Sequence, residues 1–231
     1  RGMLNALYRQ AEALGVTCVF DAPVTALDIE DGFFVSATIT QGGKEKQVRG
    51  KSLVAACGGF EANIEWLKEH WGEAADNFLI RGTPYNRGDV LKMLLAQGVM
   101  PVGDPTQMHC VAIDARAPKF DGGIATRLDS VVFGVMVNRD AQRFYDEGED
   151  TWPKRYAIWG RLIAQQPDQI GYSIIDAKSI HMFMPSIFPA VQAGTLGELA
   201  AKLELDPVAL EKTVADFNAA VKPGTFDHTV L

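Results

Sequence analysis

The chain has 231 residues, of which 47% are hydrophobic and 22% charged, which suits a folded core of one large or two small domains and argues against disorder. Its 22 basic and 29 acidic residues give a formal net charge of −7, which argues against nucleic acid as a partner because the phosphate backbone requires a basic face. The three cysteines, Cys18, Cys57 and Cys110, are widely spaced, so we expect no disulfide framework, no thiolate metal site and a cytoplasmic, reducing location.

The first hundred residues predict an α/β pattern with an antiparallel insertion. Apolar residues at helical spacing predict a helix that ends near Gly15, and Asp31-Gly32 is a strong hairpin signal between two alternating segments. The elements expected here are helices over 4–14, 60–71 and 90–97 and strands over 16–20, 24–29, 33–40 and 52–56.

From about Asp104 onward the loops become longer, and proline, glycine and arginine are frequent. Thr195 with Glu198 forms a capping box, and Asp206-Pro207 places an N-cap before a proline in the first helical turn. We expect strands over 131–138 and 171–175, followed by a helical tail. The nearly apolar run 131–137 is too short to span a bilayer.

The Cys57-Gly58-Gly59 turn lies between a predicted strand and a predicted helix. Glycines there allow a ligand to approach the backbone, and the N-terminus of the following helix favours an anion. The alternative is a tight turn without a ligand. The sequence contains no GxGxxG phosphate-binding pattern.

Arginine is concentrated in residues 81–161, which hold eight of the eleven arginines in the chain. Because a guanidinium group binds a carboxylate through two parallel hydrogen bonds, this segment suits a ligand with several carboxylates. The alternative is that these arginines lie on the surface and pair with nearby acidic residues, namely Asp146, Glu147, Glu149 and Asp150.

The four histidines have spacings that do not suit a metal site. His109, in Gln107-Met108-His109, lies next to the basic segment and is a candidate donor to a carboxylate, although a lone histidine can equally be structural. No GxSxG pattern or persuasive Ser/His/Asp or Cys/His arrangement is present.

Four stretches resemble the succinate dehydrogenase/fumarate reductase flavoprotein family. Residues 53–63, LVAACGGFEAN, resemble its ATGGF…N stretch, and Gly88-Asp89 with the helix before Gly98 resembles its GDG…AGA segment. Gln107-Met-His109 resembles its Q-x-H, and residues 137–147, VNRDAQRFYDE, resemble VNxxGxRFxNE. Within the family, residues 81–86, 112–123 and 152–160 look most like the FAD-dependent tricarballylate dehydrogenases.

This resemblance implies an α/β fold with an α+β cap. Residues 1–103 would be a partial FAD-binding, Rossmann-like domain, 104–226 an inserted capping domain of the fumarate reductase type, and 227–231 a return to the FAD-binding domain. The family's N-terminal GxGxxG segment and its C-terminal segment have no counterpart in this sequence. We therefore expect this chain alone to bind no FAD, to be a non-catalytic carboxylate-binding cap, and to expose an apolar edge.

The resemblance also assigns residues. It gives His109 and Arg155 catalytic roles, with Lys154 as the competitor of Arg155, and it requires no metal. Arg127 stands where the family has a glutamate, so the usual proton relay is altered and an additional carboxylate could be accommodated. The substrate-binding positions would be His109, Thr126, Arg127 and Lys154, and the flavin-side positions Val24, Ala56, Gly58, Gly59, Asn63 and Asp89.

The implied reaction is oxidation of tricarballylate to cis-aconitate, with hydride transfer to flavin N5 and the carboxylates held by histidine and arginine. The alternatives are a fumarate reductase- or succinate dehydrogenase-like enzyme and a 3-ketosteroid dehydrogenase-like enzyme, the last of which would need an apolar cavity. The implied partners are a small tricarboxylate or dicarboxylate and an iron–sulfur or membrane electron acceptor, which would make the protein peripheral to a membrane.

Overall fold

The computed structural model describes residues 2–120, 126–149 and 156–225. Within the chain two compact units form, one from Arg1–Gly59 with Gly88–Val102 and the other from Phe60–Arg87 with Gly103–Leu231. The mixture of helices and strands agrees with the predicted α/β class. The functional domain limits inferred from the sequence stay a prediction.

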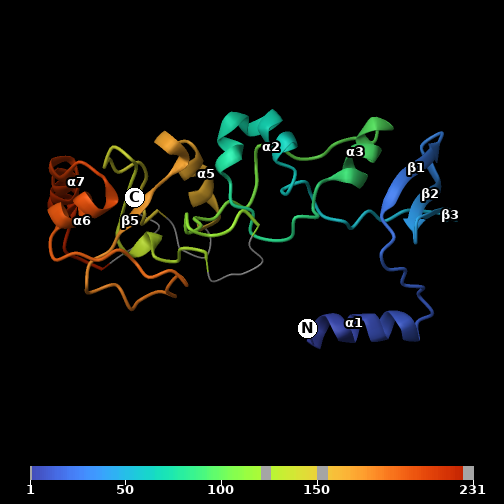
Figure 1. Cartoon of the computed structure of the whole chain (residues 1–231), viewed down its shortest axis with the longest axis horizontal. Coiled ribbons are helices and arrows are strands. Elements are labelled where there is room, and N and C mark those ends of the chain that lie inside the picture. Colours follow the sequence, from blue (N-terminus) through green and yellow to red (C-terminus); the bar gives the residue numbers. More distant parts are fainter. Residues whose placement is uncertain (1, 121–125, 150–155, 226–231) are drawn as a thin grey trace. The chain divides into compact units, whose positions relative to one another are not determined.

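The first unit consists of two helices and one antiparallel sheet (Figure 1). Strands β1 (Val24–Glu30), β2 (Phe33–Gln41) and β3 (Lys44–Arg49) pair in chain order as a meander. Asp31 and Gly32 have φ of +52° and +81°, the left-handed conformation that the predicted hairpin turn requires. Helix α3 (Asp89–Ala96) is tied to β1 by the Gln97 side chain, whose Nε2 donates to the Leu27 carbonyl over 2.8 Å.

Two strands predicted in this unit are wrong. Residues 16–20 and 52–56 pair with no strand in the part of the chain that the structure describes. A strand exists only where a neighbour satisfies its main-chain groups, so local apolar sequence does not suffice. The apolar side chains of these segments are accordingly exposed, 61% for Phe20 and 85% for Val54.

Helix α1 (Gly2–Ala13) also exposes its apolar side, since none of its residues is buried. Leu4 and Leu7 are 55% and 60% exposed, and Leu14, just after the helix, is 72% exposed. The expected apolar edge is therefore present on the first unit.

The second unit holds nearly all of the buried core. Strand β4 (Val135–Val137) pairs antiparallel with β5 (Tyr172–Ile174) and is buried on both faces, which explains its uninterrupted apolar sequence. One face contributes Val135 and Val137 to a cluster with helices α6 (Leu196–Leu203) and α7 (Pro207–Ala220), which lie side by side (Figure 1). The other face places Met136 against Trp159 of helix α5 (Trp159–Ala164).

The helix caps of this unit follow the sequence signals. Thr195 caps α6 by accepting the Glu198 N–H, and Asp206 caps α7. Helix α2 (Ile64–Trp71) begins later than predicted, because Asn63 accepts the Trp66 N–H as its N-cap. Short 3₁₀ turns complete the unit at Gly72–Asn77, Val131–Phe133, Tyr156–Ile158 and Pro167–Gln169.

Candidate functional site

The central element of the site is the extended segment that carries His109. On one side, the Cys110 N–H donates to the Ala157 carbonyl over 2.8 Å, and the Gly160 N–H donates to the Cys110 carbonyl over 2.9 Å. On the other side, the Asp114 N–H donates to the Thr126 carbonyl over 2.8 Å. This segment therefore joins the start of α5 to the segment that contains Thr126 and Arg127.

Gly160 makes this close approach possible. A Cβ at this position would lie 2.6 Å from the Val111 carbonyl oxygen and 2.9 Å from the main-chain carbon of Cys110. Both are backbone atoms, so any side chain would push the helix away from the extended segment.

Three side chains meet as a result of this pairing. The His109 imidazole contacts the Tyr156 ring edge-on, with ring centroids 5.0 Å apart and planes at 73°. The Arg127 guanidinium lies over the same ring, 5.1 Å from its centroid. The structure therefore brings His109 and Arg127 to one aromatic ring, which the sequence analysis did not identify.

Asp129 completes this cluster. Its two carboxylate oxygens accept from Nε and Nη2 of Arg127 over 2.6 and 2.9 Å. These hydrogen bonds raise the pKa of the Arg127 guanidinium, which is protonated throughout the accessible pH range. Asp129 was also missed, although alternate residues of an extended segment project from the same face and the spacing from Arg127 was a usable signal.

Thr126 is 1% exposed and lies beside this cluster in the chain. Arg155 and Lys154 lie outside the described residues. The substrate-binding and catalytic roles of these positions, and of His109 and Arg127, stay predictions.

The other arginines of the basic segment are mostly engaged elsewhere. Arg143 pairs with the buried Glu147 and with Asp146, as the alternative interpretation of the sequence predicted, and Arg139 lies near Asp168 and Glu204. Among the described residues, Arg127 is the arginine whose guanidinium contacts the Tyr156 ring. Within the described residues, the basic segment thus forms several separate ion pairs, and Arg127 is its member in contact with the Tyr156 ring of the His109 cluster.

Arg116 belongs to one of these separate pairs. Its guanidinium forms two hydrogen bonds with the carboxylate of Asp114, and Ser186 Oγ donates to the same carboxylate over 3.1 Å. Burial by itself would raise the pKa of Asp114, but the hydrogen bonds from Arg116 and Ser186 outweigh it and lower that pKa. Arg116 also packs over the Phe188 ring at 5.0 Å.

Cys110 is half-buried next to the site, and burial raises the pKa of its thiol to about 11. It therefore has little thiolate character and is a poor nucleophile. No group of three or more His, Cys, Asp or Glu side chains suitable for a metal ion occurs within residues 2–120, 126–149 and 156–225.

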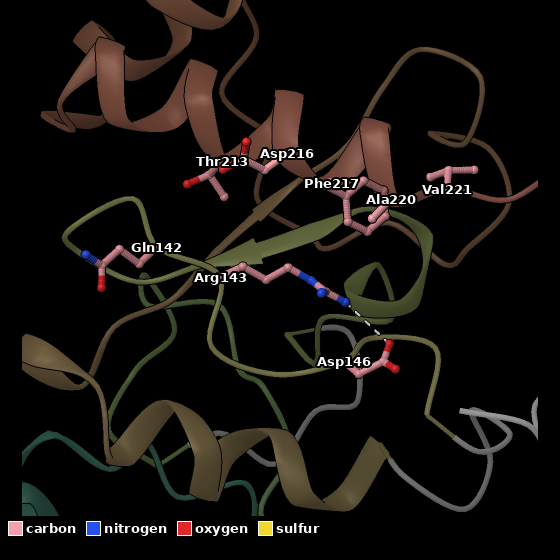
Figure 2. Close-up of a pocket in the computed structure, with 8 residues that line it drawn as sticks. All are labelled: Gln142, Arg143, Asp146, Thr213, Asp216, Phe217, Ala220 and Val221. Atoms are coloured by element: carbon pink, nitrogen blue, oxygen red, sulfur yellow. Dashed lines mark hydrogen bonds and ion pairs between the residues drawn. The ribbon is translucent and has the colours of Figure 1, made fainter.

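An open groove lies elsewhere in the second unit, between the 142–146 loop and helix α7. Figure 2 shows Arg143 extending along the loop toward Asp146, with Phe217 on the opposite wall. The Arg143 guanidinium lies 5.2 Å from the Phe217 ring centroid. His109, Thr126 and Arg127 do not line this groove, so we do not assign the predicted site to it.

Comparison with known families gives a match to the FAD binding domain model over residues 1–227. The chain belongs to this family. The family-level resemblance seen in the sequence is thereby confirmed, while a specific tricarballylate dehydrogenase identity is not.

Two relatives of known name align with 96% of the chain at 27% identity: a 4-oxocyclohex-2-ene-1-carboxylate 5-dehydrogenase from Sinomonas cyclohexanicum and an NADH:acrylate oxidoreductase from Vibrio harveyi. The alignments span 41% and 23% of the lengths of these relatives.

Solved structures agree on the fold. The 3-ketosteroid-Δ4-(5α)-dehydrogenase of Rhodococcus jostii RHA1 matches with a TM-score of 0.61 and 25% identity, over 92% of this chain and 42% of that one. A flavocytochrome c3 fumarate reductase matches with a TM-score of 0.63 and 22% identity, over 94% and 38% of the two chains. A 3-ketosteroid Δ1-dehydrogenase from Sterolibacterium denitrificans reaches 0.68 at 18% identity, over 90% and 41%.

The predicted flavin-side positions have features that fit part of an FAD site. Gly58 has φ of +84°, which favours glycine, and with Ala56 and Gly59 it presents an exposed main chain to which a ligand has access. Asp89 exposes a carboxylate in the first turn of α3, where it can accept from a hydroxyl group. Val24 is half-buried at the start of β1.

Asn63 differs from these positions. It belongs to the second unit and uses its side chain locally, accepting from Trp66 and donating to the Arg87 carbonyl over 3.0 Å. In the structure Asn63 caps α2. Contacts of Asn63 and of the other five flavin-side positions with flavin stay predictions.

Proposed function

We propose that this chain is part of a flavin-dependent oxidoreductase that acts on a CH–CH bond of a small carboxylate. The observation that carries the proposal is the contact of His109 and Arg127 with one ring, Tyr156, because an imidazole and a guanidinium together suit an anionic ligand. FAD, when bound, would accept the hydride that leaves the substrate.

His109 and Arg127 would orient the carboxylates so that the reacting carbons face the cofactor. Their N–H donors would stabilise the negative charge that develops as the proton departs. The motif resemblance assigns the proton transfer to Arg155, with Lys154 as the alternative. In the whole protein, Arg155→Ala should abolish turnover and retain flavin, whereas undiminished turnover would move the role to Lys154 or elsewhere.

The motif resemblance proposes tricarballylate as the substrate and cis-aconitate as the product. The second candidate is a substrate with fewer carboxylates, and two observations favour it. Asp129 already neutralises Arg127, and the names of both relatives specify compounds with one carboxylate, 4-oxocyclohex-2-ene-1-carboxylate and acrylate. A steroid ketone is less well suited, since it offers no anion to the guanidinium and imidazole donors.

The deciding experiment is a substrate screen with the whole protein, followed by bleaching of the flavin absorbance. Tricarballylate, succinate, 4-oxocyclohex-2-ene-1-carboxylate and a steroid ketone should be compared. Bleaching by the steroid alone would refute the carboxylate proposal. An iron–sulfur or membrane electron acceptor and a cytoplasmic location stay predictions; none of the helices described in the structure is both long and apolar enough to cross a membrane.

The role of the aromatic ring can be tested separately. Tyr156→Phe keeps both ring contacts and should retain carboxylate affinity, whereas Tyr156→Leu removes them and should weaken binding about tenfold, equivalent to about 1.4 kcal/mol. Equal affinities of the two variants would show that the ring does not organise the site.

A further inference from the structure

The Arg127 guanidinium is held on two sides by groups of this chain. Asp129 occupies the edge formed by Nε and Nη2, and Tyr156 covers a face at 5.1 Å. The side chains of Arg127 and Asp129 are only 19% and 10% exposed, so water screens their pairing less than it would on an open surface. Any anionic ligand that uses the same edge of Arg127 must compete with a carboxylate already in place.

This arrangement changes the electrostatics of the cluster. Without Asp129, Arg127 would present a full positive charge and a two-point donor edge to a ligand. With Asp129, the pair is formally neutral and the edge formed by Nε and Nη2 is occupied, while the two N–H groups of Nη1 and the second N–H of Nη2 are not used by Asp129. The cluster then attracts an anion with less net positive charge, through the N–H groups that Asp129 leaves and the imidazole of His109.

We propose that Asp129 is a specificity-determining residue that keeps Arg127 paired and so limits the number of carboxylates the site accepts. This inference rests on the proposed function and selects, within it, the substrate with fewer carboxylates. Asp129 acts through Arg127 and need not touch the substrate itself.

The test is isothermal titration calorimetry of the full chain with inorganic sulfate, tricarballylate and acrylate. In Asp129→Asn, the sulfate dissociation constant should fall about tenfold, because the positive charge of Arg127 is no longer neutralised and its Nε/Nη2 edge is no longer held by a carboxylate. Tricarballylate binding should improve similarly and acrylate binding less. The double variant Asp129→Asn/Arg127→Gln should lose the gain.

Asp216→Asn is the matched control, because it removes the same single negative charge from an exposed position on α7. Its sulfate affinity should change less than twofold. A gain equal to that of Asp129→Asn, or a gain that survives Arg127→Gln, would overturn the proposal, since the effect would then come from net charge or another residue.

Tryptophan fluorescence would verify that each variant is folded, and Asp129→Ser provides a second uncharged variant. A folded Asp129 variant without increased sulfate affinity would overturn the inference, and so would failure of both variants to fold. If wild-type chain binds the carboxylates but the variants gain nothing, the proposed function stands and this inference fails. If Asp129→Asn gains sulfate affinity through Arg127 but no carboxylate binds either form, the proposed function fails, and what stands is that Asp129 lowers the anion affinity of Arg127.

Discussion

Glu147 should be among the most sensitive positions in the second unit, because its buried carboxylate holds two elements together. The side chain is 4% exposed and accepts from the Met136 N–H over 2.7 Å and from Nε and Nη2 of Arg143 over 2.7 and 2.5 Å. Glu147→Ala leaves the buried Met136 N–H without its acceptor, at a cost of about 1–3 kcal/mol. Loss of the ion pair adds about 1–2 kcal/mol, a value reduced because the Arg143 side chain is 35% exposed and can rehydrate.

We therefore expect Glu147→Ala to lower the free energy of unfolding by about 3 kcal/mol and Glu147→Gln, which retains an acceptor for Met136, by about 1–2 kcal/mol. The assay is urea unfolding followed by tryptophan fluorescence, because all four tryptophans lie in the second unit. Asp146→Asn is the control, since Asp146 is 54% exposed and its contact with Arg143 is 3.4 Å, and it should cost less than about 0.5 kcal/mol. Equal effects of Glu147→Ala and Asp146→Asn would refute this reasoning.

Further predictions concern the site and the cofactor. Cys110, with its raised thiol pKa of about 11, should react with iodoacetamide at pH 8 about a hundredfold more slowly than the exposed Cys18 and Cys57; three equally fast thiols in a mass-spectrometric time course would contradict this. The pKa of Asp114 is lowered in the folded chain, so its carboxylate contributes to the free energy of unfolding fully above pH 3.8, and this contribution is lost as the pH falls through the lower pKa of the folded state. Asp114→Asn should therefore reduce the dependence of the free energy of unfolding on pH in the acid range. Gly160→Ala should weaken carboxylate binding and cost about 1–3 kcal/mol of stability, because its Cβ would lie 2.6 Å from a main-chain oxygen, and wild-type values in calorimetry and urea unfolding would disprove the close packing. The purified chain should be colourless, since it lacks GxGxxG, and flavin absorbance in the purified chain would disprove this.

Local signals predicted the elements whose stability is local. The caps at Thr195 and Asp206 and the hairpin at Asp31-Gly32 each involve residues within a few positions of one another, so the sequence alone identifies them. The strands expected at 16–20 and 52–56 depend on pairing with distant segments, and hydrophobicity cannot show whether a partner is present.

The same distinction holds for the candidate site. His109 was found from its place beside the basic segment and from the Q-x-H resemblance, and Arg127 was singled out by the resemblance because it stands where the family has a glutamate. Tyr156 was missed because its contacts with His109 and Arg127 depend on the packing of α5 against the 109–114 segment. The sequence indicates this packing only through Gly160, and a single glycine does not specify which segment lies against it. Asp129 was missed for a different reason, since its pairing with Arg127 requires both side chains to project from the same face of the chain, and the sequence does not show that residues 127–129 are extended.

The most specific string of the family resemblance has a structural explanation. In residues 137–147, Asn138 Oδ1 accepts from the main-chain N–H groups of Asp140 and Gln142. Ala141 occupies the glycine position of the family pattern with φ of +56° and is fully buried. These contacts, with the Arg143–Glu147 pair, fix a turn beside β4.

A motif that fixes a turn identifies a fold without specifying a substrate. Relatives with different named substrates can therefore share it, because none of the contacts described for these residues involves His109 or the Tyr156 ring. We therefore expect substrate choice to come from residues outside the string, and in the described part of the second unit Asp129 and Tyr156 are groups that contact the predicted carboxylate-binding side chains of His109 and Arg127. Substituting Asp129 or Tyr156, with residues 137–147 unchanged, should alter ligand preference more than stability. The substitutions of Glu147 should instead lower stability more than they alter ligand preference.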